Sequence, residues 1–487
     1  MTMKKKRQKR IFPRAVGAAL AVAMLCLPLA SCGFVEINYP GGGTTAAEST
    51  AATTPPATPS ETSEPPKVMT FPDRTSDAAN ALAALPSVEL GTADLIIANS
   101  YAAPDLFAPA EDDTLNAARR RRTELACARY DINLTITRAD DAELLAALQK
   151  NAAAGDYYAD LSVIPATSAA LYFNASIAAN LRELPFFVTP SDHHSAAGAG
   201  IAGSSCYFYC GDAVFDPDSI MTLYFNRTTA GAELTDSLYR RALGEGLTWE
   251  DLFTATAGRT VLCGDDGADT AFAADILCAT LGIEFVSHPQ GKSPTVNCDL
   301  DALAAANTLI GRLASVCEIS GESFDKFTRG EALFRFGTVS DIRRLYNLDC
   351  EWGILPVPMA STDGGYITLG AETRPVIACV GGAGRTELCG AALAALDAAS
   401  GAWLGDAYAD AALDTCLRDN NSYLTLRRVL DSDIRFDFAY LYAGATDELY
   451  GATIGAIRSC FEGRATLPDA IKSARSGADR ELARVFE

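Results

Sequence analysis

Three short strands separated by two helices are the feature of this sequence that most constrains its fold. The first strand, Asp94–Asn99, is apolar with almost no alternation, as in a sheet that is covered on both faces. The second, Tyr130–Arg138, alternates apolar and polar residues, and the third is Asp160–Pro165. Helices are predicted between them, at Thr114–Cys127 and from Asp140 or Asp141 to Lys150. This order predicts parallel strands joined by right-handed crossovers.

A further strand followed by a helix is predicted after Ser219. The apolar run Ile220–Phe225 is rich in β-forming residues and predicts a buried strand that ends at Asn226. Thr248 then precedes Trp249-Glu250-Asp251, where a threonine N-cap and acidic residues in the first turn favour a helix start. Because Asp251 follows Thr248 by three positions, a variant of the capping box is expected. We assign Trp249 to packing at this helix start and not to ligand contact.

The length of 487 residues is too great for one ordinary core, and 49% hydrophobic residues are enough for more than one. A second α/β set is predicted after Trp249. Its strands are Thr260–Cys263 and Ile283–Val286, and its helices are Asp269–Leu281 and Asp299–Val316. Two α/β lobes with appendages are therefore expected.

The order of these segments resembles that of bacterial extracellular solute-binding proteins of family 1, the lipoprotein receptors of sugar-type ABC importers. In that family a strand ending in Phe-Asn, as at 225–226, passes between lobes, and Thr-Trp-x-x-Leu, as at 248–252, opens a helix of the second lobe. Other similar motifs are YYADL at 157–161, NLRELP at 180–185, CYFYCGD at 206–212, FTRGEALFRFG at 327–337 and WGILPVP at 352–358. The segment LDSDIRFDFAYLY at 430–442 resembles a clostridial-type branch of the family. The resemblance covers the chain from about Asp94 to its end.

This resemblance implies an α/β fold of two lobes, similar to the type 2 periplasmic binding proteins. Each lobe would contain a mostly parallel sheet flanked by helices, with the ligand cleft between the lobes. The first lobe would be 90–223 with 373–412, and the second 226–372 with 413–487. Tyr224, Phe225 and Asn226 would then lie at the hinge.

The N-terminal segment predicts export. Basic residues at positions 4–14 precede an apolar run, Ala15–Leu29, which is too short to span a membrane, so 1–31 is interpreted as a signal peptide. Leu29-Ala30-Ser31-Cys32 resembles the lipobox of bacterial lipoproteins, in which the cysteine is lipidated; an ordinary signal peptide with an incidental Cys32 is the alternative. Residues 32–67, rich in Thr, Ser and Pro, predict a disordered tether.

Several functional classes are not supported by the sequence. The formal net charge of −21 disfavours nucleic-acid binding. The GxGxxG at 198–203 follows no buried strand and is interpreted as a loop, and Asp265-Asp266 as a turn. The adjacent His193 and His194 lack the spacing of metal ligands, and Arg119–Arg122 are assigned to a solvated helix face. We expect no catalytic residues, no metal and no cofactor, and mostly free thiols among the scattered cysteines.

A solute site needs aromatic faces and a few convergent hydrogen-bonding groups, and in open α/β sheets it lies just beyond the carboxyl ends of the strands. That rule selects residues that follow predicted strands: Ser100, Tyr101, Thr167, Ser168, Asp212, Phe215, Gly337 and Thr338. Helix N-termini at Ser168 and Thr338 would add backbone N–H donors. Ordinary capping or packing is the alternative for each. Trp352 is left open between strand packing and sugar stacking.

The resemblance implies a monomeric, lipid-anchored receptor on the extracellular face of the cell membrane. It would capture a small solute, a sugar or oligosaccharide, between its lobes and deliver it to the transmembrane subunits of an ABC permease. A surface sensor or interaction lipoprotein with the same fold is the alternative, and neighbouring permease or sensor-kinase genes would discriminate the two. An enzyme is not predicted, because the sequence contains no recognisable nucleophile–base pair or metal cluster.

Overall fold

The computed structural model describes residues 75–486 except 111–113, 188–200, 203, 257, 259, 264–271, 288–291, 320–321, 372–373, 401–403 and 437. The predicted signal peptide, Cys32 and the predicted tether therefore lie outside the described residues, as do the three histidines and Asp265-Asp266. Of the GxGxxG segment, only Ile201 and Ala202 are described, as the short strand β4.

The first sheet contains four strands in the order β14-β3-β1-β2. Their bounds are β1 Ala93–Ser100, β2 Ile132–Ala139, β3 Leu161–Pro165 and β14 Pro375–Cys379. β1 pairs in parallel with both β2 and β3, as the strand–helix order predicts, whereas β14 pairs antiparallel with β3. Because β14 arrives late in the chain and runs against its neighbour, it enters this sheet from the side where the other three strands end.

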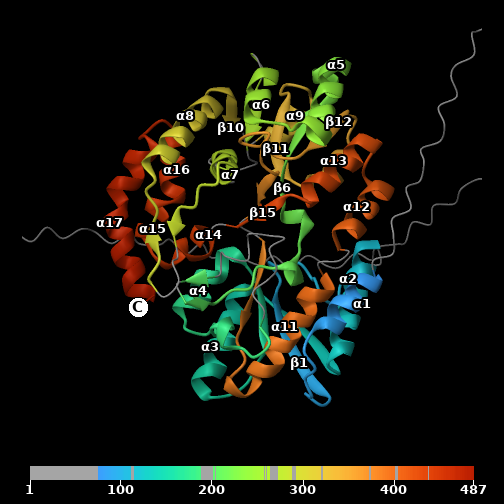
Figure 1. The fold of residues 1–487 in the computed structure, drawn as a ribbon, viewed down its shortest axis with the longest axis vertical. Coiled ribbons are helices and arrows are strands. Elements are labelled where there is room, and N and C mark those ends of the chain that lie inside the picture. Colours follow the sequence, from blue (N-terminus) through green and yellow to red (C-terminus); the bar gives the residue numbers. More distant parts are fainter. Residues whose placement is uncertain are drawn as a thin grey trace, which may run out of the picture. The chain divides into compact units, whose positions relative to one another are not determined.

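Both faces of the first sheet are covered by helices, which explains the unbroken apolar run of β1. The helices are α1 Thr75–Ala84, α2 Thr114–Arg129, α3 Asp141–Ala154, α4 Ala169–Asn174 and α11 Thr386–Ser400. Leu161 and Val163 of β3 join the core beneath α2 and α11, and the next residue, Ile164, joins the core on the opposite face with Leu144 of α3. Figure 1 shows α11 and α3 beside this sheet.

The second sheet contains five strands in the order β10-β7-β11-β6-β12. Their bounds are β6 Met221–Asn226, β7 Val261–Cys263, β10 Cys317–Ile319, β11 Phe334–Thr338 and β12 Trp352–Leu355. The pairs β10–β7 and β7–β11 are parallel, whereas β6 pairs antiparallel with both β11 and β12. In each sheet, therefore, the antiparallel strand is the one that the chain forms on arriving from the other sheet.

The helices between these strands are α5 Arg227–Arg240, α6 Trp249–Thr256, α7 Phe272–Thr280, α8 Leu300–Val316, α9 Ser323–Thr328 and α10 Asp341–Tyr346. A π-helical turn, Arg241–Glu245, extends α5. The short strands β8 Val286–Ser287 and β9 Thr295–Val296 form a separate antiparallel pair. The strand predicted at Ile283–Val286 is therefore largely wrong, because Ile283–Glu284 form no strand and β8 joins neither large sheet.

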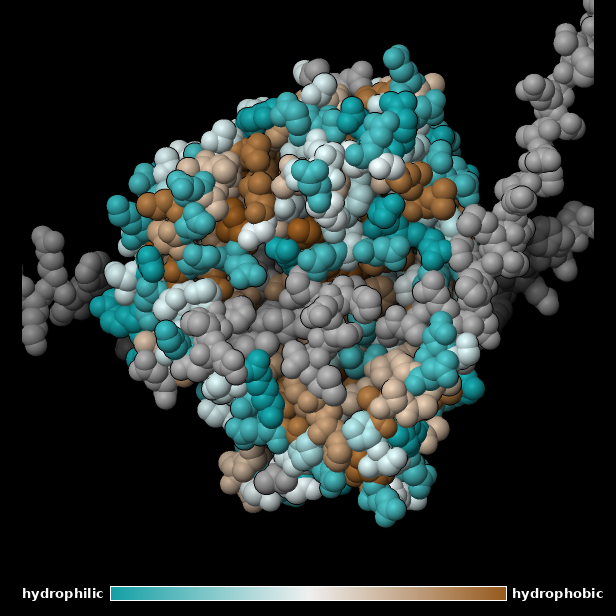
Figure 2. Space-filling model, in the orientation of Figure 1, coloured by the Kyte–Doolittle hydropathy of each residue, from teal (hydrophilic) through white to brown (hydrophobic). Residues whose placement is uncertain are grey.

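The C-terminal part is helical. Its elements are α12 Leu404–Thr415, α13 Asn420–Leu430, α14 Phe438–Tyr442, α15 Asp447–Ala452, α16 Ile454–Phe461 and α17 Leu467–Phe486. α16 and α17 pack on α8, and α12 contacts both α2 and α13. Two short strands, β13 Ile367–Leu369 and β15 Asp433–Arg435, pair in parallel. On the face shown in Figure 2, hydrophilic side chains gather over the outer helices such as α5.

The helix start at Thr248 is confirmed in detail. Thr248 N donates to Asp251 Oδ2 at 2.9 Å, and Asp251 N donates to Thr248 Oγ1 at 3.3 Å, which is the reciprocal pattern of a capping box. Trp249 is buried, stacks on Phe336 and donates its indole N–H to Thr280 Oγ1 at 2.8 Å. The assignment of Trp249 to packing is therefore confirmed.

No single described helix is long and apolar enough to cross a membrane. One bent pair, α11 with α12, meets the criteria of length and composition.

Candidate functional site

Two segments that cross between the sheets pair with each other. Ile220, just before β6, forms an antiparallel bridge with Gly370, and Ala371 N donates to Ser219 O at 2.7 Å. On the second sheet, Val339 N, directly after β11, donates to Ile220 O at 2.8 Å. On the first sheet, Ala166 N, directly after β3, donates to Arg374 O at 2.9 Å. The carboxyl ends of β3 and β11 therefore attach to the same pair of segments. We call these segments, 216–220 together with Gly370 and Ala371, the crossing.

Tyr101 is the exposed aromatic residue at the carboxyl end of β1. Its side chain is 60% exposed, and the guanidinium of Arg138, near the end of β2, lies 5.3 Å from its ring centre. Arg138 is itself held by Ala103 O, to which its Nη2 donates at 2.8 Å. The preceding Ser100 is buried, and its Oγ accepts from Ala102 N at 3.1 Å, which shapes the turn. Tyr101 thus presents an exposed aromatic ring, with a cation over one face, at the carboxyl edge of the first sheet.

Polar groups also gather where β3 ends. Thr167 is exposed, whereas Ser168 is buried and donates its hydroxyl to the carboxylate of Asp141, at the start of α3. The other carboxylate oxygen of Asp141, Oδ1, is buried and makes no hydrogen bond to any residue that the structure describes. Ser168 lies in the 3₁₀ turn Ala166–Ser168 that leads into α4, and its side chain caps no backbone N–H there. Its hydroxyl therefore orients a carboxylate.

At the end of β11, Thr338 lies against the crossing and Gly337 has a packing role. Thr338 Oγ1 and Ser340 Oγ share a hydrogen bond of 2.7 Å, and Thr338 O accepts from Tyr224 OH at 2.8 Å. A Cβ on Gly337 would collide with both members of the buried ion pair between Arg335 and Asp341, whose atoms are 2.7 Å apart. Glycine is therefore required here for close packing.

Asp212, Phe215 and Trp352 do not lie with the residues described above at the carboxyl ends of β1, β3 and β11. Asp212 is buried under α11, where its backbone N–H donates to Asp397 Oδ1 at 3.1 Å. Phe215 packs in a core cluster with Leu404 of α12. Trp352 is 3% exposed and pairs with Asn226, at the end of the second sheet opposite the crossing. Since β12 runs parallel to β11, its first residue lies far from the carboxyl edge, so Trp352 packs on Tyr224.

The predicted hinge residues Tyr224, Phe225 and Asn226 lie inside the second sheet. Pairing places Met221 opposite Thr338 and Asn226 opposite Trp352, so the chain has completed its crossing before Tyr224. The crossing lies earlier, at 216–220. The sequence pattern located the strand correctly but could not tell which sheet the strand joins.

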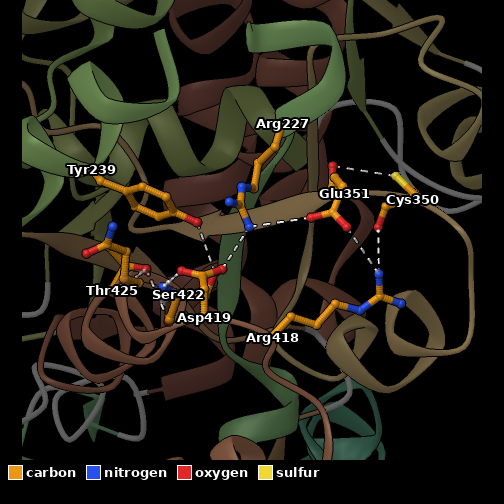
Figure 3. A network of polar contacts seen from close by, with 9 residues as sticks. Arg227, Tyr239, Cys350, Glu351, Arg418, Asp419, Ser422 and Thr425 are labelled. Carbon is orange, nitrogen blue, oxygen red and sulfur yellow. Dashed lines mark hydrogen bonds and ion pairs between the residues drawn. The ribbon is translucent and has the colours of Figure 1, made fainter. Parts of the chain in front are cut away.

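The end of β6 is also fixed by a polar network. Arg227 Nη1 lies 3.1 Å from Asp419 Oδ2 and 3.6 Å from Glu351 Oε2, and Arg418 lies 3.8 Å from Glu351 Oε1. Asp419 in turn caps α13 by accepting from Ser422 N at 2.8 Å. Figure 3 shows these side chains converging from the ends of β6, β12 and α13. This network holds the end of β6 that is opposite the crossing against the ends of β12 and α13.

Next to the crossing lies a cluster of buried charges that sequence reasoning missed. Arg119 of α2 is 7% exposed, and its Nη2 lies 3.9 Å from Asp216 Oδ1. Arg374 is also buried, and its Nε and Nη1 make no hydrogen bond to the described residues. Burial, with the nearby carboxylate of Asp218, raises the pKa of Asp216 to about 6, although Arg119 and Arg374 oppose the shift. Burial likewise lowers the pKa of Arg374.

The same cluster continues into the second sheet through Asp218. Its Oδ2 accepts from Arg343 of α10 at 2.6 Å, and its Oδ1 accepts from Tyr408 of α12 at 2.7 Å. Charged groups on α2, the crossing and α10, together with the Tyr408 hydroxyl on α12, therefore fix the path of the chain between the sheets. The described residues contain no group of three or more His, Cys, Asp or Glu that could hold a metal ion.

The assignment of Arg119–Arg122 to a solvated face is wrong for two of the four. Arg122 is 1% exposed and donates to Leu106 O at 2.6 Å, Ala213 O at 3.1 Å and Ser400 Oγ at 2.5 Å. Burial lowers the pKa of Arg122 to about 10. Only Arg121 is openly exposed, because α11 and α12 cover the other side of α2.

A pocket of about 490 Å³ is formed by residues between Ala242 and Asp433, separate from the residues described above. It is lined by the end of the π-helical turn after α5, by the loop 359–366 and by Arg428, Asp431 and Asp433. Tyr366 at its floor donates to Ala242 O and accepts from Leu247 N. None of the residues selected from the sequence lines this pocket.

Comparison with solved structures decides the fold. A cyclic α-maltosyl-1,6-maltose-binding protein from Arthrobacter globiformis superposes with a TM-score of 0.52 at 14% identity, covering 81% of this chain and 100% of that one. The chain has the two-lobe α/β fold of solute-binding proteins. At this identity the likeness concerns the fold alone. The predicted fold class is confirmed, and we now call the parts built on the first and second sheets the first and second lobes.

Two further similar structures have lower scores. A family 1 extracellular solute-binding protein from Bifidobacterium longum subsp. infantis has a TM-score of 0.49 at 15% identity, covering 79% of this chain and 98% of that one. A protein described as a de novo designed esterase has a TM-score of 0.48 at 13% identity, covering 82% and 100%. No protein-family model matches the sequence, and no curated protein matches it.

Proposed function

We propose that this protein is a non-enzymatic, extracellular receptor of an ABC importer that captures a carbohydrate between its two lobes and passes it to a membrane permease. The observation that carries the proposal is the group at the carboxyl edge of the first sheet. There Tyr101, backed by Arg138, stands with the Asp141 carboxylate beside the segment that leads into the crossing.

This arrangement has the chemistry that a sugar needs. The apolar face of a sugar ring packs on an aromatic ring, and its hydroxyls need both donors and acceptors. Asp141 supplies a carboxylate at this edge, and Thr167 and Thr338 carry hydroxyls on the two lobes. We propose Ser100, Tyr101, Thr167, Ser168 and Thr338 as the ligand-proximal set from the sequence, with Arg138 and Asp141 added. The carbohydrate class rests on this chemistry and on the resemblance of the sequence motifs.

Closure would occur about the crossing. We propose that 216–220 together with Gly370 and Ala371 form the hinge, because the carboxyl ends of β3 and β11 both attach there. The lobe boundaries are accordingly proposed near those of the sequence prediction, with β6 wholly in the second lobe and β14 wholly in the first.

The anchoring part of the proposal rests on the N-terminal sequence. Lipidation at Cys32 after removal of 1–31 would hold a monomer to the extracellular face of the membrane, and 32–67 would be the tether. A Cys32→Ser variant expressed in its native host should appear in the medium and lose incorporation of labelled fatty acid. Retention in the membrane with undiminished label would rule out Cys32 as the anchor.

Ligand binding is tested with the soluble part of the chain that begins after Cys32. Thermal unfolding is followed with a panel of oligosaccharides, amino acids and peptides, and a ligand at 100 times its Kd should add about 2.7 kcal/mol to the free energy of unfolding. The carbohydrate assignment fails if only an amino acid or peptide shifts the transition. The receptor role itself fails if none does so while the near-UV circular dichroism is native. Intact oligosaccharide recovered by mass spectrometry after long incubation supports the non-enzymatic part.

A further inference from the structure

Two buried cysteines meet at the edge of the first lobe farthest from the crossing. Cys379 is the last residue of β14, and Cys389 lies in the first turns of α11. Both are fully buried in the apolar core between the sheet and α11. The described cysteines, these two included, are free thiols in the structure.

Backbone geometry brings the two residues to one point. Cys389 Sγ donates to Asp160 O at 3.8 Å, and Asp160 directly precedes Leu161, the register partner of Cys379. The backbone N–H groups of Val380 and Gly381, which follow Cys379, donate to the same oxygen at 2.9 and 3.0 Å. Both side chains lie in the same apolar core cluster, where the two thiols interact with each other. The carbonyl oxygen of Asp160 therefore contacts both the end of β14 and the start of α11.

We propose that Cys379 and Cys389 are a disulfide-forming pair, and that the structure shows its reduced form. Two thiols held beside the same backbone group can reach the S–S bond length of about 2 Å by side-chain rotation. The oxidant would be a small-molecule disulfide such as oxidised glutathione. The two cysteines lose two protons and two electrons and form one S–S bond, while the oxidant is reduced to two thiols.

Four other described cysteines contact a side-chain amide or a backbone carbonyl. Cys460 donates to Asn307 Oδ1 at 3.2 Å, and Cys350 accepts from Asn226 Nδ2 at 3.3 Å. Cys206 and Cys210 each contact Phe208 O, at 3.6 and 4.0 Å. These contacts place the four sulfurs against amides and carbonyls, so they provide a comparison set within the same chain.

Burial determines when the bond can form. An oxidant cannot reach fully buried sulfurs. The bond therefore forms while the chain folds or opens locally. Because Cys379 lies at the opposite end of β14 from Pro375 and the crossing, the bond would tie β14 to α11 without altering the path of the chain between the lobes.

The test is to refold the full chain from denaturant in a buffer of oxidised and reduced glutathione. Remaining thiols are then alkylated, and the unreduced protein is digested and fragmented in a mass spectrometer. We expect a peptide pair joined through Cys379 and Cys389, with Cys206, Cys210, Cys350 and Cys460 alkylated. The oxidised protein should melt at a higher temperature than the same sample after reduction.

Two variants control for a wrong assignment of the disulfide. In Cys389→Ser the linked pair should disappear and Cys379 should be alkylated, whereas Cys460→Ser should leave the link intact. Should a variant fail to refold, the map of the wild-type chain still decides. Alkylation of both Cys379 and Cys389 in the oxidised wild type, or a bond from either one to a different cysteine, would overturn the proposal.

Discussion

The side chain of Arg374 lies directly against the Cα of Gly370, four residues earlier in the crossing. A Cβ built on Gly370 would stand 2.7 Å from Arg374 Cδ and 3.1 Å from its Nη1. Arg374 is fully buried near Asp212, Asp216 and Tyr209, so an added methyl group would force a buried side chain to shift. The glycine and the arginine therefore form one packed unit at the point where the lobes join.

Replacing that glycine should disturb the crossing. In Gly370→Ala the added methyl group overpacks the site, so we expect a loss of about 1–3 kcal/mol in the free energy of unfolding. Urea unfolding measures it. Gly365→Ala is the matched control, because nothing lies within 4 Å of its Cβ position. Equal stability of the two variants would contradict the packing described here.

The charge of Asp216 should make stability depend on pH. Burial raises its pKa from 3.8 to about 6, so the folded state keeps a proton that the unfolded state has released. The contribution of Asp216 to stability therefore falls as pH rises from about 4 to about 6, by at most about 3 kcal/mol. Asp216→Asn does not titrate, so its stability relative to wild type should rise over this interval. Urea unfolding at several pH values tests this, and a constant difference would refute it.

Arg122 and Arg121 are neighbours in sequence, but replacing them should change the stability of the protein by very different amounts. Arg122→Ala removes hydrogen bonds to Leu106 O and Ala213 O and leaves a cavity, so we expect a loss of about 3 kcal/mol or more. Arg121→Ala removes an exposed ion pair with Glu124 and should change stability by no more than about 0.5 kcal/mol. Thermal unfolding of both variants gives the comparison. Similar melting temperatures would mean that Arg122 is not buried in solution.

Tyr101 should contribute to ligand affinity and little to stability. Its ring is 60% exposed, so Tyr101→Ala should weaken binding of the solute found by thermal shift by about tenfold, for a stacking loss of about 1.4 kcal/mol. Tyr346→Ala is the control: its ring is 46% exposed and also faces an arginine, Arg418, but it lies at the end of α10 away from the crossing. Calorimetric titration should show unchanged affinity for the control. Equal affinities for both variants would remove Tyr101 from the site.

Much of the fold could be predicted because its signals are local. The βαβαβ order of the first lobe and the capping box at Thr248 depend on residues close in sequence, and both are confirmed. The burial of Arg122 could not be predicted in this way. Its partner Ser400 is remote in sequence, and a run of four arginines on a helix covers every face equally.

The candidate site was predictable only in part, for a similar reason. The carboxyl-edge rule selected Tyr101 and Thr338, which do lie at the ends of β1 and β11, but it could not show that Gly337 makes room for the Arg335–Asp341 ion pair. It also missed Arg138 and Asp141, since each was assigned to a strand or a helix start and not to a turn. Tyr224, Phe225 and Asn226 lie inside β6 and not between the sheets, because a strand pattern does not reveal which sheet the strand enters.

The origin of β14 also constrains the order in which the protein can fold. β3 has its outer edge paired by a strand that begins at Pro375, after all five strands of the second sheet. Until β14 arrives, the first sheet has three of its strands and an open edge at β3. Open edges pair readily with other chains. The first lobe is thus complete only when a segment that follows the second sheet in the chain has covered that edge.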